Sequence, residues 1–415
     1  MAGLPDVHDY SARARSWLVA NARPRVAAAA AWGSGSDDVS VFHDLPDEQE
    51  SALLERLMAW QRRKFDAGYG AITWPVEQGG AGLPVGYEQA FLDEEAQYET
   101  PTGHETFSVT TRLVAPTIGM FGTPEQQGRF VRPFVRTEQL CCQLFSEPGA
   151  GSDLAGLATR AVRDGDEWVV TGQKVWSSGA RFSAWGLLIA RTDPEVTKHA
   201  GLTAFMVPMD APGIEVCPIR QMTGGASFNE VFLDGVRLTD DLRLGAVGEG
   251  WKVTLVTLAF ERAASGAHRD EDRGGSWDRV LGLARHVGAT GDPVTRQRLA
   301  ELYTLDRLRA LSDARAAATA NGEGPGPLGS LGKLQWTQWM NRVSDVVSGL
   351  LGPRLTADSG EWGAFAWTKH LLGAPGYRIA GGSDEIQRTI IGERVLGLPP
   401  EPRPDRGIPF SQIPR

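Results

Sequence analysis

One glutamate in this 415-residue chain is a candidate general base, because it follows a long apolar segment. Glu261 comes directly after Val253–Phe260, a run with helical spacing. No basic residue lies three or four positions from it on a helix, where the neighbours are Thr257, Leu258, Ala264 and Ser265. With no ion pair from its own helix, the carboxylate is expected to be desolvated, with a pKa raised toward neutrality, as removal of a carbon-bound proton requires. The alternative is a glutamate at the edge of a core, paired with a distant arginine.

A glycine-rich string is the second candidate for chemistry. Ser146–Asp153 reads SEPGAGSD, and its small residues leave backbone N–H groups uncovered, so that a ligand can approach the main chain. Ser146 and Ser152 add hydroxyl donors. The string is not the G-x-G-x-x-G dinucleotide fingerprint, and no βαβ unit surrounds it. By composition alone, a plain glycine-rich turn is an equal alternative.

The elements that would position these residues begin with helices and then turn to strands. Helical spacing predicts helices over about 6–32, 45–67, 84–98 and 124–136. Near residue 140 the pattern changes to alternation. A hairpin is predicted from Ala158–Arg163 and Glu167–Thr171, on either side of the Asp164-Gly165 turn. Further strand-like runs cover 185–190, 202–207 and 230–233.

From Gly250 onward the pattern is helical again. Helices are predicted over about 251–266 and 295–320, up to about 351 after a turn-rich linker at 321–329, and after Gly381-Gly382. We therefore expect an α+β fold: an all-α N-terminal domain (1–137), a small central β-barrel or β-sandwich domain (138–248), a C-terminal four-helix bundle (249–397) and an extended, proline-rich tail (398–415).

Composition narrows the classes of function. The net charge is −9 and the pI about 5.4, and an acidic surface repels phosphate backbones and anionic membrane leaflets. No apolar stretch approaches the roughly 20 residues that span a bilayer, and the first residues lack the apolar region of a signal peptide. Three cysteines form neither a disulfide framework nor a zinc spacing. We expect a cytoplasmic protein without nucleic-acid, membrane or metal partners.

Taken with the α–β–α order, the SEPGAGSD string closely resembles the FAD-facing signature of the acyl-CoA dehydrogenase family. The resemblance covers nearly the whole chain: Gln173–Gly179 resembles the family's second flavin segment, and Gly381–Gln387 its C-terminal signature. It implies FAD as cofactor. It also implies an isoalloxazine site lined by Phe145, Ser146, Trp176 and Ser178, a pyrophosphate or acyl-CoA contact at Gly151 and Ser152, and FAD seating by Ser383 and Glu385. The alternative for Trp176 is a residue of the hairpin core.

The resemblance also bears on the base. Many family members carry the catalytic glutamate at the position of Gly381, which has no side chain. Another branch, which includes isovaleryl-CoA and long-chain enzymes, places it before an arginine on the first helix of the C-terminal domain. Glu261-Arg262 matches that branch. By resemblance, Glu261 removes the α-proton, the Gly381 N–H polarises the thioester carbonyl, and Arg262 lies on the substrate side.

The chain departs from the family at the contacts to a neighbouring subunit's flavin. Ala284 stands where many relatives have an arginine, and Arg285 or His286 are candidates to replace it. The usual glutamine is missing around Gly349–Pro353. These departures resemble bacterial dehydrogenases of bulky acyl-CoAs, including steroid side chains, some of which pair two different subunits.

The implied partners are an acyl-CoA or acyl-carrier-protein thioester, an electron-transfer flavoprotein or similar acceptor, and further subunits in a homo- or hetero-oligomer, expected to be a dimer of dimers. Two alternatives stay open. The same fold could carry a flavin monooxygenase or oxidase, although such an enzyme needs no α-proton base. The chain could also be a non-catalytic partner subunit, which the altered flavin contacts favour and the intact SEPGAGSD string opposes.

Overall fold

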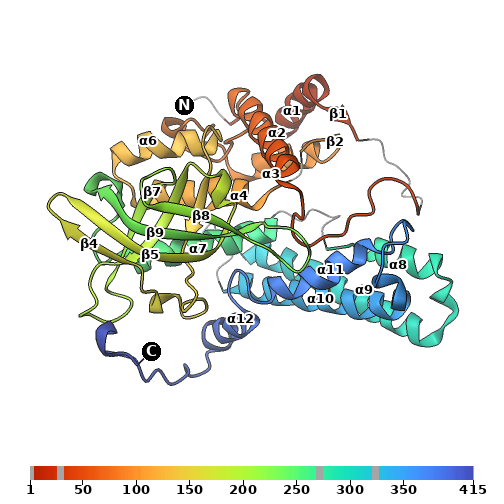
Figure 1. Ribbon diagram of the computed structural model, residues 1–415. Coiled ribbons are helices and arrows are strands. Elements are labelled where there is room, and N and C mark those ends of the chain that lie inside the picture. Colours follow the sequence, from red (N-terminus) through yellow and green to blue (C-terminus); the bar gives the residue numbers. More distant parts are fainter. Residues whose placement is uncertain (1–3, 26–31, 102, 268–273, 320–326, 415) are drawn as a thin grey trace.

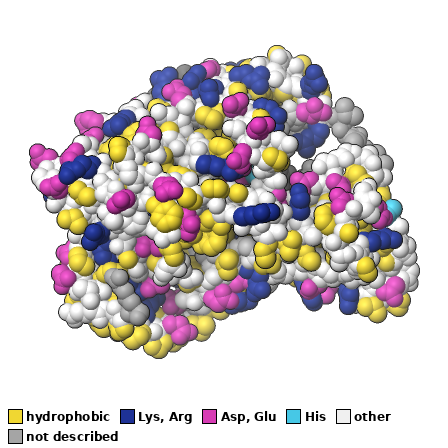
Figure 2. Space-filling view, in the orientation of Figure 1, with side chains coloured by type: hydrophobic (Ala, Val, Ile, Leu, Met, Phe, Trp, Pro, Cys, Tyr) yellow, Lys and Arg dark blue, Asp and Glu magenta, His cyan; other side chains and the backbone are white. Residues whose placement is uncertain are grey.

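The computed structural model describes residues 4–25, 32–101, 103–267, 274–319 and 327–414. Helices form the N-terminal part, strands the middle and helices the C-terminal part, as the sequence predicts (Figure 1). No helix within these ranges is long and apolar enough to cross a membrane. Basic and acidic side chains are interspersed over the face shown in Figure 2.

The N-terminal part is built from helices, of which the first three share an aromatic core and the later ones pack into the core of the central part. Their bounds are α1 Val7–Asn21, α2 Asp47–Asp66, α3 Val85–Glu95, α4 Glu105–Ser108, a π-helical turn Val109–Val114, α5 Ala115–Phe121 and α6 Pro124–Val135. Acidic residues occupy the first turn of α2, and a capping box between Thr123 and Gln126 starts α6. The continuous helical stretch from α4 to α5 was not predicted.

The predicted first helix is too long. In the structure, α1 ends at Asn21, and Arg23–Pro24 (β1) pairs antiparallel with Tyr98–Glu99 (β2). Pro24 cannot donate a backbone hydrogen bond, so it ends a helix but is tolerated in a short edge strand. The end of the prediction, 26–31, lies outside the described residues.

The middle part is one eight-stranded sheet in the order β10-β7-β6-β4-β5-β9-β8, with β3 parallel to β6. The strands are β3 Cys141–Leu144, β4 Arg160–Asp164, β5 Glu167–Ser178, β6 Trp185–Arg191, β7 Leu202–Pro208, β8 Ile214–Ile219, β9 Phe228–Thr239 and β10 Arg243–Leu244. The predicted hairpin is confirmed as β4–β5, with Asp164 opposite Glu167. The sequence did not predict β3, β8 and β10, which are short or do not alternate.

The C-terminal part is helical, and its apolar core also includes Val39, Val41 and Phe42 of the N-terminal part, whereas Val253 of its first helix packs into the core of the central part. It comprises α7 Gly250–Ala267, α8 Trp277–His286, α9 Pro293–Thr319, α10 Leu328–Leu351, α11 Ala366–Tyr377 and α12 Asp384–Ile390. The sequence did not predict α11, because Gly373, Pro375 and Gly376 interrupt its pattern. The predicted linker at 321–329 lies mostly outside the described residues.

The C-terminal tail, the dark blue end in Figure 1, returns to the central part, where the N–H groups of Phe410 and Ser411 donate to the carbonyls of Val196 and Pro194 between β6 and β7. Phe410 is buried, and the guanidinium of Arg191 lies 3.4 Å from its ring centroid. Lys198 bridges Asp153, at the end of the glycine-rich string, and Asp405 of the tail, at 2.8 and 2.5 Å. The prediction of a merely extended tail is therefore wrong at its end, where Phe410–Gln412 forms a docked 3-10 turn.

Candidate active site

The structure brings the two catalytic candidates together. Glu261 lies half-buried on α7, and Gly381-Gly382 forms the turn before α12, with φ of +64° and +82°. Such left-handed backbone favours glycine. A Cβ atom at Gly381 would lie 3.0 Å from Oε1 of Glu261. The carboxylate on α7 thus reaches the space that a side chain at 381 would enter.

A lysine that the sequence analysis missed faces this pair. Lys333 on α10 is almost fully buried, and its Nζ donates to the carbonyl of Gly382 at 2.7 Å. Burial lowers the pKa of Lys333, while the carboxylates of Asp384 and Glu261 act in the opposite direction. The sequence analysis found no basic residue three or four positions from Glu261 on its own helix. The cation near this carboxylate comes from a different helix, α10.

The first turn of α12 is held by its own polar residues. The Ser383 hydroxyl caps the helix by accepting from the Ile386 N–H at 3.3 Å. Asp384 is buried and accepts from the Thr337 hydroxyl and the Arg378 Nε, both at 2.9 Å. Glu385 is exposed and 3.8 Å from Arg388. Ser383 and Glu385 therefore lie beside the Glu261 site, and their contact with FAD stays a prediction.

On the central sheet, the two predicted flavin segments lie side by side. The Val175 N–H donates to the carbonyl of Ser146 at 2.9 Å, and Lys174 Nζ donates to the carbonyl of Phe145 at 3.0 Å. The Phe145 ring is buried in the core, whereas Ser146 is half-buried. Gly151 and Ser152 are exposed, and a Cβ at Gly151 would meet nothing within 4 Å. The main chain of the string is therefore open to a ligand.

A buried ion pair that the sequence analysis missed fastens these segments. Lys174 has no exposed side-chain surface, and its Nζ donates to Glu147 Oε1 and to the Ile189 carbonyl, both at 2.8 Å. Glu147 also accepts from the N–H groups of Ala158 and Thr159 at 2.6 and 2.9 Å.

The pKa values of this pair show opposing effects of burial and charge. Burial lowers the pKa of Lys174 to about 8, against the attraction of Glu147. For Glu147, burial raises the pKa, but Lys174 and the hydrogen bonds outweigh it and leave the pKa below 4.5. Glu147 lies in the SEPGAGSD string and Lys174 in the Gln173–Gly179 segment, and this was the only indication of the pair in the sequence.

Trp176 is held out of the core. Its φ is +62°, at an irregularity in the β5–β9 pairing, and its side chain is 57% exposed. A positive φ in a bulky residue is a strained conformation, and such irregularities re-aim side chains. The alternative of a hairpin core residue is therefore wrong. Ser178 is half-buried two residues further along the same strand.

These features fit the group that the resemblance implies. An exposed indole suits the face of a flat ring, and the open main chain around Gly151 suits phosphates. The buried Ser177 hydroxyl, between Trp176 and Ser178, has no hydrogen-bond partner within the described part of the chain. FAD therefore fits the residues that the structure places here.

The remaining predicted residues are less informative. Arg262 lies on α7, and its side chain is outside the described residues. Ala284 is fully buried. His286, a candidate to replace the missing arginine, lies 2.9 Å from Glu361 and stacks on Trp32. Both His286 and Arg285 are exposed, so exposure does not distinguish the two candidates.

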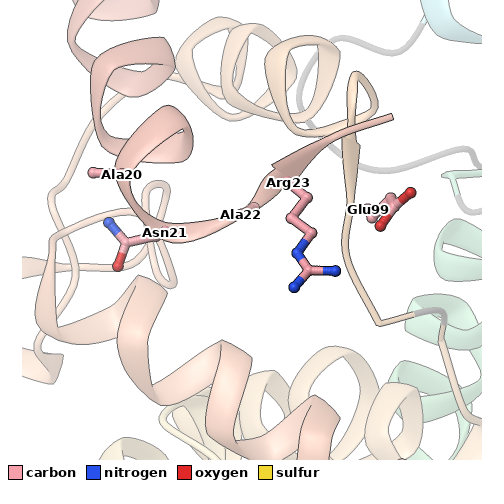
Figure 3. A pocket seen from close by; sticks show the side chains of 5 residues that line it. All are labelled: Ala20, Asn21, Ala22, Arg23 and Glu99. Atoms are coloured by element: carbon pink, nitrogen blue, oxygen red, sulfur yellow. The ribbon is translucent and has the colours of Figure 1, made fainter. Parts of the chain in front are cut away.

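A pocket of about 440 Å³ lies elsewhere, where α1 passes into β1 (Figure 3). It is lined by Ala20, Asn21, Ala22, Arg23 and Glu99. None of the candidate site residues lines it, so we assign it no part in the chemistry.

Comparison with known protein families gives three consecutive matches. Residues 46–138 match the acyl-CoA dehydrogenase N-terminal domain, 142–236 the middle domain and 248–396 the C-terminal domain. The chain belongs to the acyl-CoA dehydrogenase family. Its homologues are named acyl-CoA dehydrogenases, which are FAD-dependent oxidoreductases, and the chain is an oxidoreductase of this class.

Relatives with established names extend over almost the whole acyl-CoA dehydrogenase chain. Acyl-CoA dehydrogenase IpdE1 of Mycobacterium tuberculosis is 40% identical over 403 residues, which covers 96% of this chain and 99% of that protein. Acyl-CoA dehydrogenase FadE34 of the same organism is 38% identical and covers 92% of this chain, but the match spans 49% of that longer protein.

Solved structures give the same fold. The Tcur3481-Tcur3483 steroid ACAD has a TM-score of 0.73 at 27% identity and covers 96% of this chain and 99% of its own. The ChsE4-ChsE5 complex from Mycobacterium tuberculosis has a TM-score of 0.70 at 26% identity and covers 97% and 100%.

Proposed function

We propose that this acyl-CoA dehydrogenase oxidises an acyl-CoA thioester to the trans-2-enoyl-CoA with Glu261 as base. The observation that carries the proposal is the 3.0 Å between Glu261 Oε1 and the Cβ position of Gly381. By resemblance, Gly381 occupies the position from which many family members present their glutamate. A carboxylate from α7 that reaches this space can serve the same side of a substrate.

Each residue of the site then has a separate role in the reaction. Glu261 takes the α-proton, and the electron pair of that C–H bond forms the new double bond as the β-hydride leaves. The Gly381 N–H donates to the thioester carbonyl, where negative charge develops. Bound FAD supplies the acceptor for the β-hydride. Ser146, Trp176 and Ser178 would hold its ring, Gly151 and Ser152 its phosphates or the acyl-CoA, and Ser383 and Glu385 the rest of the cofactor.

The first expected result concerns the cofactor. Purified with any obligate partner, the protein is expected to be yellow and to contain FAD rather than FMN, because the open main chain at Gly149–Ser152 suits a diphosphate. The visible spectrum and chromatography of the released flavin measure this. A colourless protein that takes up no FAD when it is supplied would rule out the catalytic proposal.

The second expected result concerns the substrate. Gly381 adds no side chain beside the α-carbon, so branched or ring-bearing acyl groups are expected to be preferred. One 28% identical relative is named cyclohexane-1-carbonyl-CoA dehydrogenase, and a structural neighbour is a steroid ACAD. The measurement compares kcat/KM for cyclohexane-1-carbonyl-CoA with that for butyryl-CoA. A clear preference for butyryl-CoA contradicts this part of the proposal.

A second candidate is a partner subunit without activity of its own. It is favoured by the burial of Ala284 in place of an arginine and by the contact of His286 with Glu361. The steroid ACAD and ChsE4-ChsE5 neighbours carry two protein names each, so a heteromer is a reasonable assembly here. The visible spectrum of the chain alone, compared with that of the complex, separates the two candidates.

We place the active assembly in the cytoplasm, as a dimer of dimers that passes electrons to an electron-transfer flavoprotein or a similar acceptor. A flavin monooxygenase on the same fold would instead give an oxygenated product in air. The Glu261 carboxylate at Gly381 favours the dehydrogenase, because oxygenation by a flavin needs no α-proton base.

A further inference from the structure

Lys333 lies next to the proposed base, and the mechanism above gives it no role. Its side chain is 8% exposed, on a helix that packs against both α7 and α12. Its ammonium donates to the carbonyl of Gly382 at 2.7 Å. That carbonyl also accepts from the Gln387 side chain at 3.1 Å, so two donors hold the second glycine of the turn.

The ion pair that Lys333 forms with Asp384 is long. Asp384 Oδ1 lies 3.9 Å from Nζ, and that carboxylate is already bonded by Thr337 and Arg378. A buried ammonium is costly unless its charge is matched by nearby carboxylates. The shortest hydrogen bond of Lys333 Nζ goes to the neutral carbonyl of Gly382, in the turn that the Glu261 carboxylate approaches.

The charged groups that face Lys333 come from every element around it. Asp384 and Glu385 belong to α12, Glu261 to α7, and Arg378 follows α11. Asp384 is balanced by Arg378 at 2.9 Å, and Glu385 is exposed to solvent. Glu261 is half-buried on α7, and its carboxylate approaches the Gly381-Gly382 turn, whose second carbonyl accepts from Lys333.

We propose that Lys333 is a positioning residue for the base. It fixes the Gly381-Gly382 turn through the Gly382 carbonyl, and its charge keeps Glu261 ionised beside that turn. The inference rests on the proposed function of Glu261. It adds that the readiness of this carboxylate to accept a proton at neutral pH depends on a cation from a different helix.

The test measures the ionisation of Glu261 directly, without a substrate. Infrared difference spectra over an acid-to-neutral pH series identify the carboxylic-acid band that Glu261→Gln removes. The midpoint of this band is then compared in Lys333→Met, Lys333→Gln and Lys333→Arg. Arg342→Met is the control, because Arg342 is an exposed cation on the same helix, paired with Glu301 and Asp345.

Removal of the charge is expected to raise the midpoint by about one pH unit, since an opposite charge nearby stabilises a carboxylate by this order. Lys333→Met and Lys333→Gln should both show this shift, and Lys333→Arg and Arg342→Met should not. Gln retains a donor for Gly382, so its shift isolates the charge even if the Met variant fails to fold.

In kinetic terms, flavin reduction in Lys333→Gln should slow by about two- to fivefold at neutral pH, because a one-unit rise in the pKa protonates a larger fraction of Glu261, and it should recover as the pH rises. A loss of the same size at every pH, with an unshifted midpoint, would mean that Lys333 only supports the fold and would overturn the inference. That result leaves the proposed function intact. The proposed function fails separately if Glu261→Gln reduces its flavin at the wild-type rate.

Discussion

Glu261→Gln is expected to slow the reduction of the flavin by acyl-CoA by about 10²–10⁴-fold, the usual contribution of a general base. The fold and the FAD content should not change. The amide has nearly the same volume as the carboxylate, so the 3.0 Å approach to Gly381 can persist. It cannot accept the α-proton. We expect the upper end of the range, because the neighbouring Asp384 is buried and bonded by Thr337 and Arg378.

The measurement is anaerobic bleaching of the flavin band on addition of acyl-CoA, for the wild type and the variant under the same conditions. Glu249→Gln is the matched control, because Glu249 is a half-exposed carboxylate immediately before α7, paired with Lys252. It should bleach at the wild-type rate. Equal rates for Glu261→Gln and the wild type would place the base elsewhere and remove the central assignment.

Moving the carboxylate to position 381 is a poor way to rescue this variant. Gly381 has φ of +64°, which any other residue adopts with strain, and a Cβ there would press on the side chain at 261. The family resemblance gives two positions from which a catalytic glutamate can be presented, 261 and 381. The structure shows that the backbone at 381 suits glycine and that the carboxylate approaches from α7.

Local patterns explain which parts of the fold were predictable. The β4–β5 hairpin follows from alternation around Asp164-Gly165, and α7 from apolar spacing before Glu261, because both depend on neighbours in sequence. The end of α1 was missed because Arg23–Pro24 pairs with residues more than seventy positions away. Spacing along one chain segment carries no information about such a partner.

The same reason limits what could be predicted of the site. The resemblance locates Ser146, Trp176 and Glu261, but the groups that fix them come from other elements. Lys333 reaches the Gly381-Gly382 turn from α10, and its helical pattern marks it as an ordinary polar position. Lys174 and Glu147 are 27 residues apart. Long-range polar contacts of this kind become visible only with the fold.

Lys174→Met is expected to destabilise the protein by about 3–5 kcal/mol, because it leaves Glu147 buried without its cation. The carbonyls of Phe145 and Ile189 lose a donor as well. The measurement is denaturant unfolding followed by fluorescence. Arg237→Met is the control: it breaks exposed pairs with Asp164 and Glu167 on the same sheet, and such pairs contribute about 0–1 kcal/mol.

The double variant Lys174→Met with Glu147→Gln should recover much of this loss, since no buried charge then remains unpaired.

The pH dependence of the unfolding free energy gives an independent check. In the wild type the pKa of Glu147 lies below its ordinary value of 4.5, so its contribution is present above that pH and is lost as the pH falls through the folded-state pKa. In Lys174→Met the cation is lost and only the hydrogen bonds from Ala158 and Thr159 oppose burial, so the pKa of Glu147 rises and acid relieves the variant while it destabilises the wild type. The difference in unfolding free energy between the two should therefore be largest near neutrality and narrow below about pH 4.5. A difference that stays constant down to acid pH would show that Lys174 contributes through packing, and not through its charge on Glu147.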